Sequence, residues 1–310
     1  MSRRTVHVFP GQGDFSPRVL ARAARAHRTV GEALSETYSV TDEVGRGYGL
    51  PPLRDALLGT GPPSGADLAA AVPGTHQIAL YGAQLTVHRA LTAAGYAPHR
   101  VVGVSFGEIP ALVAAGRLTT ADGAHAAVRT ARALLRHPGG MTLIAAPEKD
   151  THRVLRAAGC PQVVRACTNE PDKVVITGPE GQLTRAEQHM ARHGIGATRL
   201  RLPFMCHHPA MEATARELAD ALAPLPAQPG RLPVYSATHD RRYDEQDDVL
   251  RCFTRSLTHP FDLLRAAATA DSGQPGLWLE AGTGTAVTDA VRRADPRRTA
   301  HAPLAEHLFP

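Results

Sequence analysis

Lysine is almost absent from this chain of 310 residues: of 34 basic side chains, only Lys149 and Lys173 are lysines. Aromatic residues make up 5% of the chain and include one tryptophan. The basic residues do not gather in one helix or arm, and few rings are available to stack on bases, so nucleic-acid binding is not expected. The net charge of +5 would suit an acidic partner.

Cysteine is also scarce, and the four cysteines form no CxxC pair. This pattern argues against a structural zinc site and a disulfide framework, and predicts reduced thiols in a cytoplasmic protein. No apolar run reaches the roughly eighteen residues of a membrane helix. The first residues, MSRRTVHVFPGQG, lack the apolar core of a signal peptide. We therefore expect neither membrane attachment nor a bound metal.

What is present is the pattern of an α/β protein, with 43% apolar and 20% charged residues. An apolar strand at 5–9 runs into a Pro-Gly turn, and residues 77–94 have helical spacing that ends at Gly95. A second strand at 100–104 leads into a helix from about Phe106. This order predicts a large subdomain with a parallel sheet, similar to the α/β-hydrolases.

Residues 139–204 show a different pattern, in which strands and helices follow in the order βαββαβ. That order is typical of a ferredoxin-like unit. We expect a small subdomain at 139–204, inserted into a large subdomain formed by 1–138 and 205–310.

The pentapeptide Gly103-Val104-Ser105-Phe106-Gly107 is a GxSxG motif between a predicted strand and helix. Glycines permit the sharp turn of a nucleophile elbow, and the helix that follows directs N–H groups at the serine. Ser105 is therefore a candidate nucleophile. The alternative is a strand–turn–helix junction that contains serine by chance, because GxSxG alone is a short motif.

A serine nucleophile needs a base, and His207 is the candidate among sixteen histidines. It stands in LPFMCHHPAME, where the chain returns from the small unit to the large one. Alternatively, His207 and His208 only cap the helix after Pro209. A Cys-His-His metal site is disfavoured, because adjacent residues seldom point at one ion.

Five motifs occur in an order that resembles the malonyl-CoA:acyl-carrier-protein transacylase family, which includes the acyltransferases of fatty acid and polyketide synthases. They are FPGQG at 9–13, GVSFGE at 103–108, CTNEPDKVVITGP at 167–179, FMCHHPAM at 204–211 and LEAGTG at 279–284.

The resemblance implies roles for individual residues. Ser105 matches the nucleophile that forms an acyl ester, and His207 matches its base. Gln12 matches a glutamine that shapes the oxyanion hole together with the main-chain N–H of Phe106. The family orients its histidine with a main-chain carbonyl, which we expect within residues 255–257.

Departures from the family pattern bear on the substrate. Malonyl-type members carry an arginine 25 residues after the serine, and this position is Thr130 here. A carboxylate desolvated without a cation is costly, so we expect a neutral acyl group. A shift of register by one residue would instead give the role to Arg129.

The residues before the base indicate a roomy pocket. In the family this stretch sorts acyl groups and often has a bulky aromatic residue before the histidine, where Cys206 stands here. We expect Phe204, Met205 and Cys206 to line the acyl pocket together with Thr130 and Asn169. Small Cys206 and flexible Met205 would leave room for a large group.

The sequence therefore predicts an acyltransferase that moves an acyl group between carrier proteins. It is most similar to the discrete, trans-acting enzymes of macrolactam polyketide pathways, which pass an aminoacyl or dipeptidyl starter from a standalone carrier protein to a synthase. The substrate would be carried on the phosphopantetheine of the carrier, and the enzyme, expected to be a monomer, would bind no cofactor. Carrier contacts are predicted at Arg153, Met205 and Arg298.

Three alternatives remain open from the sequence. An editing hydrolase would use Ser105 and His207 but resolve the ester with water. A malonyl or starter-unit transacylase would follow the family pattern more closely. A catalytically inactive docking module would not require Ser105, His207 and Gln12 together.

Overall fold

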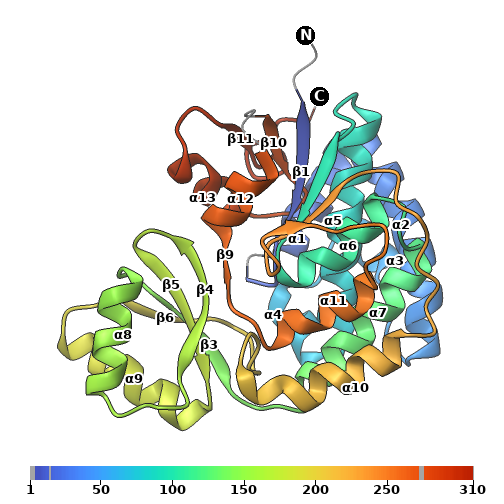
Figure 1. Cartoon of the computed structure of the whole chain (residues 1–310). Coiled ribbons are helices and arrows are strands. Elements are labelled where there is room, and N and C mark those ends of the chain that lie inside the picture. The colour runs from blue at the N-terminus through green and yellow to red at the C-terminus, as the bar shows by residue number, and fades with distance from the viewer. Residues whose placement is uncertain (1–3, 14, 272–275, 310) are drawn as a thin grey trace.

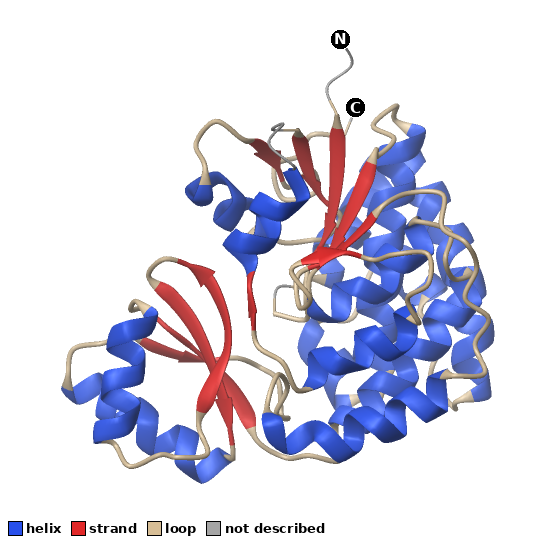
Figure 2. Cartoon of the chain, in the orientation of Figure 1, coloured by secondary structure: helices blue, strands red, loops and turns tan. Residues whose placement is uncertain are grey.

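The computed structural model describes residues 4–13, 15–271 and 276–309. Two sheets form the framework, a larger one covered by helices and a smaller one with two helices of its own (Figures 1 and 2). Their strand orders are β11-β10-β1-β2-β7-β8 and β6-β3-β5-β4-β9. The predicted α/β architecture with a large and a small subdomain is confirmed.

The larger sheet is parallel from β11 to β7, and only β8 runs antiparallel, against β7. Because parallel strands end at one edge, the segments that follow β1, β2 and β10 lie together there. Residues 10–13, 104–107 and 281–284 therefore share one edge of the sheet. The strands are β1 Thr5–Phe9, β2 Arg100–Gly103, β7 Val234–Ser236, β8 Arg241–Arg242, β10 Leu277–Glu280 and β11 Thr299–His301.

The central helix of the large subdomain is α5 (Thr75–Ala93), which is buried along most of its length between α2 and α7. It begins two residues before the predicted range, and Gly95 follows it at a φ of +91°. Side-chain caps fix other helix starts, as Thr119 and Asp122 do for α7. The remaining helices of this part are α1 Pro17–Ala26, α2 Arg28–Gly47, α3 Arg54–Leu58, α4 Gly65–Ala70, α6 Glu108–Ala114, α7 Thr120–Leu134, α10 Glu212–Leu222, α11 Val249–Thr254, α12 Leu263–Asp271 and α13 Ala286–Ala294, with short 3₁₀ turns η1 Ser105–Gly107, η2 Pro209–Met211 and η3 Arg255–Leu257.

The smaller unit has the predicted βαββαβ order, and its sheet order β6-β3-β5-β4 is that of a ferredoxin-like fold. All pairs among these four strands are antiparallel. Its elements are β3 Gly140–Ile144, α8 Glu148–Ala157, β4 Val164–Glu170, β5 Lys173–Gly178, α9 Glu180–Arg192 and β6 Ala197–Arg199.

The smaller sheet gains a strand that the sequence pattern does not reveal. β9 (Phe261–Asp262) comes from the segment predicted for the large subdomain, yet it pairs in parallel with β4. Arg165 supports this pairing by donating a hydrogen bond to the carbonyl of Phe261 at 3.2 Å. A two-residue strand is too short to leave a periodic signal, so only the folded chain shows that β9 joins the two parts.

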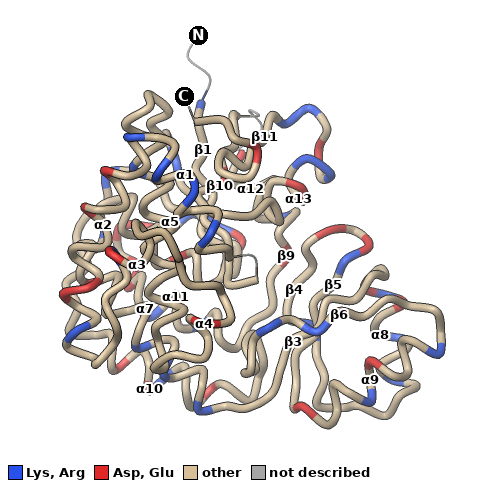
Figure 3. The backbone as a smooth tube through the Cα atoms, turned by 180° about the vertical axis from the view of Figure 1, so that it is seen from behind, with Lys and Arg blue, Asp and Glu red and all other residues tan. Residues whose placement is uncertain are grey.

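Basic and acidic positions are interspersed along the backbone of both subdomains (Figure 3). Within the described part of the chain, no helix has the length and apolarity needed to cross a membrane.

A buried histidine pair holds β1 against α5. The Nε2–H group of His7 donates to the carbonyl of Tyr96 at 2.8 Å, so its Nδ1 accepts from Nδ1–H of His88 at 2.9 Å. Burial lowers the pKa of His7 to about 4 and that of His88 to about 3. Both rings are therefore neutral at neutral pH.

This pair makes stability fall as the pH falls. His7 is protonated near pH 6.5 in the unfolded chain but only near pH 4 in the folded chain. Unfolding between these two pH values therefore takes up a proton. The shift corresponds to at most about 3 kcal/mol. His7→Gln can still donate to Tyr96 but cannot take up the proton, so we expect its melting temperature to depend less on pH between 7 and 4.5. Equal pH dependence in calorimetry of both proteins would contradict this expectation.

Candidate active site

Ser105 stands at the turn between β2 and α6, in a strained backbone conformation. Its φ of +55° lies in the left-handed region, which is uncommon for residues other than glycine. The N–H of Val104 donates to the carbonyl of Phe9 at 3.0 Å and fixes the turn against β1. The 3₁₀ turn η1 and α6 follow directly, so Ser105 lies at the positive end of a helical segment.

The two glycines of the motif are required because the backbone packs closely here. A Cβ on Gly103 would lie 2.5 Å from Cα of Glu108. A Cβ on Gly107 would overlap the carbonyl oxygens of Phe9 and Pro10. The predicted elbow geometry is thus present, and both glycines have a steric reason.

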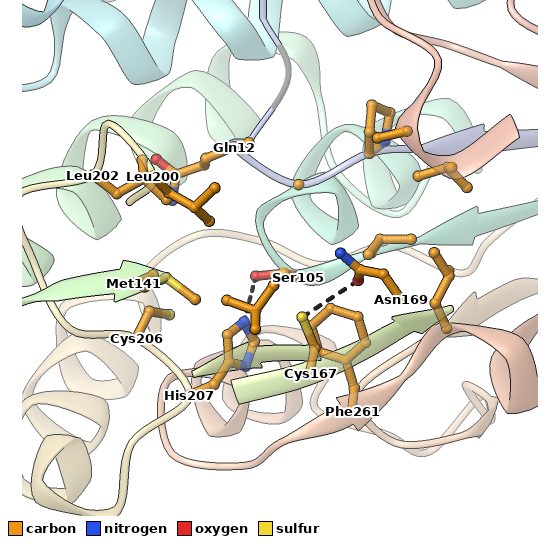
Figure 4. Close-up of a pocket in the computed structure, with 18 of the residues that line it drawn as sticks. Gln12, Ser105, Met141, Cys167, Asn169, Leu200, Leu202, Cys206, His207 and Phe261 are labelled. Carbon is orange, nitrogen blue, oxygen red and sulfur yellow. Dashed lines mark hydrogen bonds between the residues drawn. The ribbon is translucent and has the colours of Figure 1, made fainter. Parts of the chain in front are cut away.

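His207 faces Ser105 from the segment that leads out of the small subdomain (Figure 4). Its Nε2 lies 2.8 Å from Ser105 Oγ, and its Nδ1 lies 2.9 Å from the carbonyl oxygen of His259. A carbonyl only accepts, so Nδ1 carries the proton and Nε2 is free to accept from the serine hydroxyl. His207 also has a left-handed backbone, with a φ of +57°.

The orienting carbonyl differs from the expected one. The predicted stretch 255–257 supplies the carbonyl of Leu257, which accepts from the N–H of His208 at 2.9 Å. The ring of His207 instead uses His259, two residues further along. His208 caps the next turn, because its Nδ1 accepts from the N–H of Ala210 at 3.1 Å. The two histidines therefore have separate positions, one at Ser105 and one as a cap.

Burial decides the protonation state of the site. It lowers the pKa of His207 to about 4, although the hydrogen bond to His259 acts in the opposite direction. His207 is therefore neutral at pH 7 and able to accept a proton. Burial also raises the pKa of Cys167 and of Cys206 to about 12, so neither thiol competes as a nucleophile.

Glu108, the first residue of α6, connects the turn at Ser105 to β7 and the segment after it, a role that the sequence does not indicate. Its buried carboxylate accepts hydrogen bonds from Ser236 Oγ at 2.7 Å and Tyr243 Oη at 2.5 Å. Burial raises the pKa of Glu108 to about 7, although these two donors lower it. The first residue of α6 is thereby tied to β7 and to the segment after it.

Gln12 lies beside the dyad, as expected for a residue of the FPGQG turn. Its Oε1 accepts a hydrogen bond from Nε2 of Gln77 at 3.0 Å. Phe106 is buried directly after the serine, at the start of the helical segment. Its main-chain N–H thus belongs to the group of amides at that positive end. The oxyanion role of both residues stays a prediction.

A cavity of about 120 Å³ surrounds Ser105 and His207. No charged residue occurs among the described residues that line it. The lining is apolar apart from small polar groups, and it consists of Pro10, Gly11, Gln12, Gly13, Val104, Ser105, Met141, Cys167, Asn169, Val175, Leu200, Leu202, Phe204, Cys206, His207, Phe261, Leu263, Ala286 and Val287. Phe204, Cys206 and Asn169 therefore lie where the sequence predicts them.

Two predicted pocket residues do not reach this cavity. Thr130 is buried in α7 and lies outside the lining. Arg129 does not compensate, because its Nε donates to Tyr48 and its Nη1 to the carbonyl of Ala221. Met205 is buried on the side of Gly139, because alternate residues of the extended segment face opposite ways.

The predicted carrier contacts also need correction. Arg298 is 9% exposed and forms an ion pair with Asp271, so its charge is compensated inside the protein. Buried Met205 likewise presents little surface to a partner. Arg153 is exposed on α8, where it pairs only with Asp150 at 3.2 Å.

Several apolar residues that line the cavity at Ser105 were not predicted from the sequence. Met141 lies on β3, and Leu200 and Leu202 follow β6. The alternation in Leu200-Arg201-Leu202 is a signal that could have placed both leucines on one face. Phe261 belongs to β9, which had no signal.

Comparisons with known proteins agree with this geometry. Residues 69–295 match the family model described as an acyl transferase domain. The chain is 29% identical over 232 residues to a component of the phenolphthiocerol/phthiocerol polyketide synthase of Mycobacterium tuberculosis, covering 73% of this chain and 15% of the relative. It is 31% identical over 237 residues to the spectinabilin polyketide synthase system protein NorA′ of Streptomyces orinoci, covering 75% of this chain and 6% of the relative. The chain thus spans only a small part of these relatives.

Solved structures share the whole fold. Malonyl-CoA:acyl carrier protein transacylase from Xanthomonas oryzae superposes with a TM-score of 0.85 and 27% identity, covering 99% of this chain and 96% of that one. The acyltransferase domain from module 8 of the salinomycin polyketide synthase superposes with a TM-score of 0.80 and 26% identity, covering 96% of this chain and 70% of that one. A third similar chain comes from the structure of a type II polyketide synthase acyl-carrier protein in complex with its malonyl-transacylase. Its TM-score is 0.82 at 22% identity, and 99% of both chains is covered, which shows a shared fold. This chain belongs to the acyl transferase domain family and is an acyltransferase of the kind found in polyketide synthases and malonyl-CoA:acyl-carrier-protein transacylases.

Proposed function

We propose that this enzyme transfers a neutral, bulky acyl group between acyl carrier proteins through an ester on Ser105. The observation that carries the proposal is the uncharged lining of the cavity beside the Ser105–His207 pair. A malonyl carboxylate buried there would meet no cation, at a cost of several kcal/mol. A neutral acyl group avoids that cost.

The geometry suits a two-step transfer. His207 Nε2 accepts the proton of Ser105 Oγ while Oγ attacks the thioester carbonyl of the donor. The resulting oxyanion faces the N–H of Phe106 and the Gln12 turn. When the C–S bond breaks, the imidazolium returns its proton to the leaving thiolate, and the acyl group remains on Oγ.

The second step reverses the first with a different thiol. His207 takes the proton of the acceptor thiol, whose sulfur attacks the ester carbonyl. When the ester C–O bond breaks, the proton passes from His207 to Ser105 Oγ. Both thiols belong to phosphopantetheine arms of carrier proteins, and the enzyme itself contributes no cofactor. The trans-acting role and the aminoacyl or dipeptidyl type of starter rest on the family resemblance.

Intact-mass spectrometry after exposure to acyl-pantetheine compounds tests the proposal directly. Wild-type protein should gain one acyl group and Ser105→Ala none. Release of free acid without an acceptor would instead identify a hydrolase. An adduct that persists in Ser105→Ala would show that another residue is the nucleophile.

The pH dependence of acylation should follow His207. Because its pKa is about 4, the ring is neutral from about pH 5.5 to 8, and titration of His207 should leave the rate unchanged over this range. The rate should fall as the pH drops through 4. The acylation rate of His207→Ala should be about 10²- to 10⁴-fold lower than that of the wild type, since general base catalysis contributes that much.

His208→Ala is the matched control, because the ring of His208 caps a turn and donates to the carbonyl of Gln162 at 3.0 Å, so it does not contact Ser105. Its acylation rate should fall by less than about 10-fold. Equal losses in the two variants would contradict the assignment of His207 as the base. So would a break in the rate near pH 6.5 that persists in Glu108→Gln, because this variant removes the other group near Ser105 that titrates close to neutral pH.

Selection against a carboxylate is the second expectation. Butyryl-pantetheine and malonyl-pantetheine are similar in size, yet the butyryl compound should acylate Ser105 at least about 10-fold faster in kcat/KM, since burying an unpaired carboxylate costs more than 1.4 kcal/mol. Stopped assays analysed by mass spectrometry provide the rates. Equal rates would show that a cation reaches the substrate after all.

Carrier recognition is the third expectation, with Arg153 as the remaining predicted contact. Arg153→Glu should raise the KM for an acylated carrier protein about 5-fold and leave acyl-pantetheine kinetics unchanged, because exposed charge pairs contribute about 1 kcal/mol or less. Arg28→Glu on α2 is the control, since Arg28 is also exposed and paired on its own helix. The same KM for carrier in both variants would place docking elsewhere.

A further inference from the structure

A second cavity adjoins the active-site cavity on the side of Gln12. Its volume is about 350 Å³, larger than the first. The two cavities share four lining residues, which are Gln12, Gly13, Leu200 and Leu202. The shared residues place the second cavity directly beside the first, on the side of Gln12 and Leu200. It opens between α4 and the segment after β6.

The first cavity alone is too small for a bulky acyl group. A cavity of about 150 Å³ holds one benzene molecule, and the cavity at Ser105 measures about 120 Å³. A longer acyl group on Ser105 must therefore extend beyond it, and the second cavity is the neighbouring space that shares four of its lining residues.

The direction of the acyl group is assigned from the side on which the second cavity lies. Met141, Cys206 and Leu200 lie on one side of the Ser105–His207 pair, and Asn169 lies on the other (Figure 4). Apolar side chains occur on both sides, and the acyl chain is assigned to the side of Leu200 because this side borders the second cavity. The phosphopantetheine arm then lies on the side of Asn169, whose side-chain amide can form hydrogen bonds with the two amides of the arm.

The second cavity has small walls and hydrogen-bond donors at its mouth. Gly65, Ala66 and Ala69 are small residues of its lining, and Phe15 is aromatic. Of the two arginines in its lining, Arg199 is occupied by Glu187 at 2.6 Å and 2.9 Å and by Glu180 at 2.6 Å.

The other donors of the second cavity are free to meet a ligand. Arg201 is exposed and has no ion-pair partner within the described chain. His76 is half-buried, and burial lowers its pKa, so its neutral ring can donate one N–H.

We propose that the second cavity holds the distal part of the acyl group carried on Ser105. The substrate class is an elongated acyl group that is apolar near the thioester and bears a hydrogen-bond acceptor, such as an amide carbonyl, at its far end. This inference rests on the proposed function, because it assumes an acyl ester on Ser105.

Ala69→Trp tests the proposal by filling the second cavity without touching the first. Octanoyl-pantetheine should then acylate Ser105 at least about 10-fold more slowly in kcat/KM, and acetyl-pantetheine at the wild-type rate. Ala70→Trp is the matched control, since Ala70 is exposed on the same helix but does not line the cavity. It should leave both rates unchanged.

The outcomes separate the two proposals. If no probe acylates wild-type Ser105, the proposed function fails. If Ala69→Trp slows both probes equally, the second cavity holds the pantetheine arm and this inference is overturned. If Ala69→Trp slows neither probe, the acyl group takes another path and the inference is also overturned.

Arg201→Met provides an independent measurement of the distal acceptor. Wild-type enzyme should prefer N-acetyl-6-aminohexanoyl-pantetheine, which bears an amide carbonyl at its far end, over octanoyl-pantetheine by about 3- to 10-fold. The variant should lose this preference and keep its acetyl rate. An unchanged preference would overturn the assignment of Arg201 to the distal end.

Discussion

A single main-chain carbonyl, that of His259, decides where the ring of His207 lies and which of its nitrogens carries the proton. Many acyl-transfer sites use a carboxylate for this purpose, which also stabilises the imidazolium. A carbonyl is neutral and adds no charge to a buried site. The histidine can thus be buried, neutral and oriented at once, and its pKa of about 4 results from burial, which outweighs the opposite effect of the hydrogen bond to His259.

The position of that carbonyl depends in turn on the junction between the two sheets. Pro260 and β9 follow His259 directly, and β9 pairs with β4 of the smaller sheet. Asp262 then caps α12 by accepting from the N–H groups of Leu264 and Arg265. The ring of His207 is therefore aligned by a segment that belongs to both parts of the molecule. Its partner Ser105 is fixed separately, by β1, β2 and Glu108. A shift between the two sheets would move the base relative to the nucleophile. The pairing of β9 with β4 therefore helps to hold the catalytic pair in place, although it involves only two residues of β9.

Sequence reasoning was strongest where the pattern is local. The βαββαβ unit, the elbow at Ser105 and the central helix α5 each follow from periodicity or from glycines that the backbone requires. The base His207 needed the family resemblance, because nothing in the histidine pattern alone distinguishes it from His208. Sequence reasoning failed for features that depend on the direction of a side chain or on pairing between distant segments. Met205 and Arg298 point into the protein, Thr130 lies outside the cavity, and β9 is too short to detect.

The uncharged cavity also limits what the site can discriminate. An arginine in a pocket selects a carboxylate through a large electrostatic difference, whereas an apolar wall separates acyl groups by only about 1–3 kcal/mol for each methylene. Two acyl groups of similar length and polarity would hence be difficult for this cavity to distinguish. In the proposed transfer between carrier proteins, contacts between the protein and the carrier would supply much of the remaining selectivity, since a carrier brings its acyl group with it. Such contacts can be individually weak and still effective, because like charges opposed across an interface reject the wrong carrier. The loss of a pocket cation therefore transfers part of the specificity from the acyl group to the protein that delivers it.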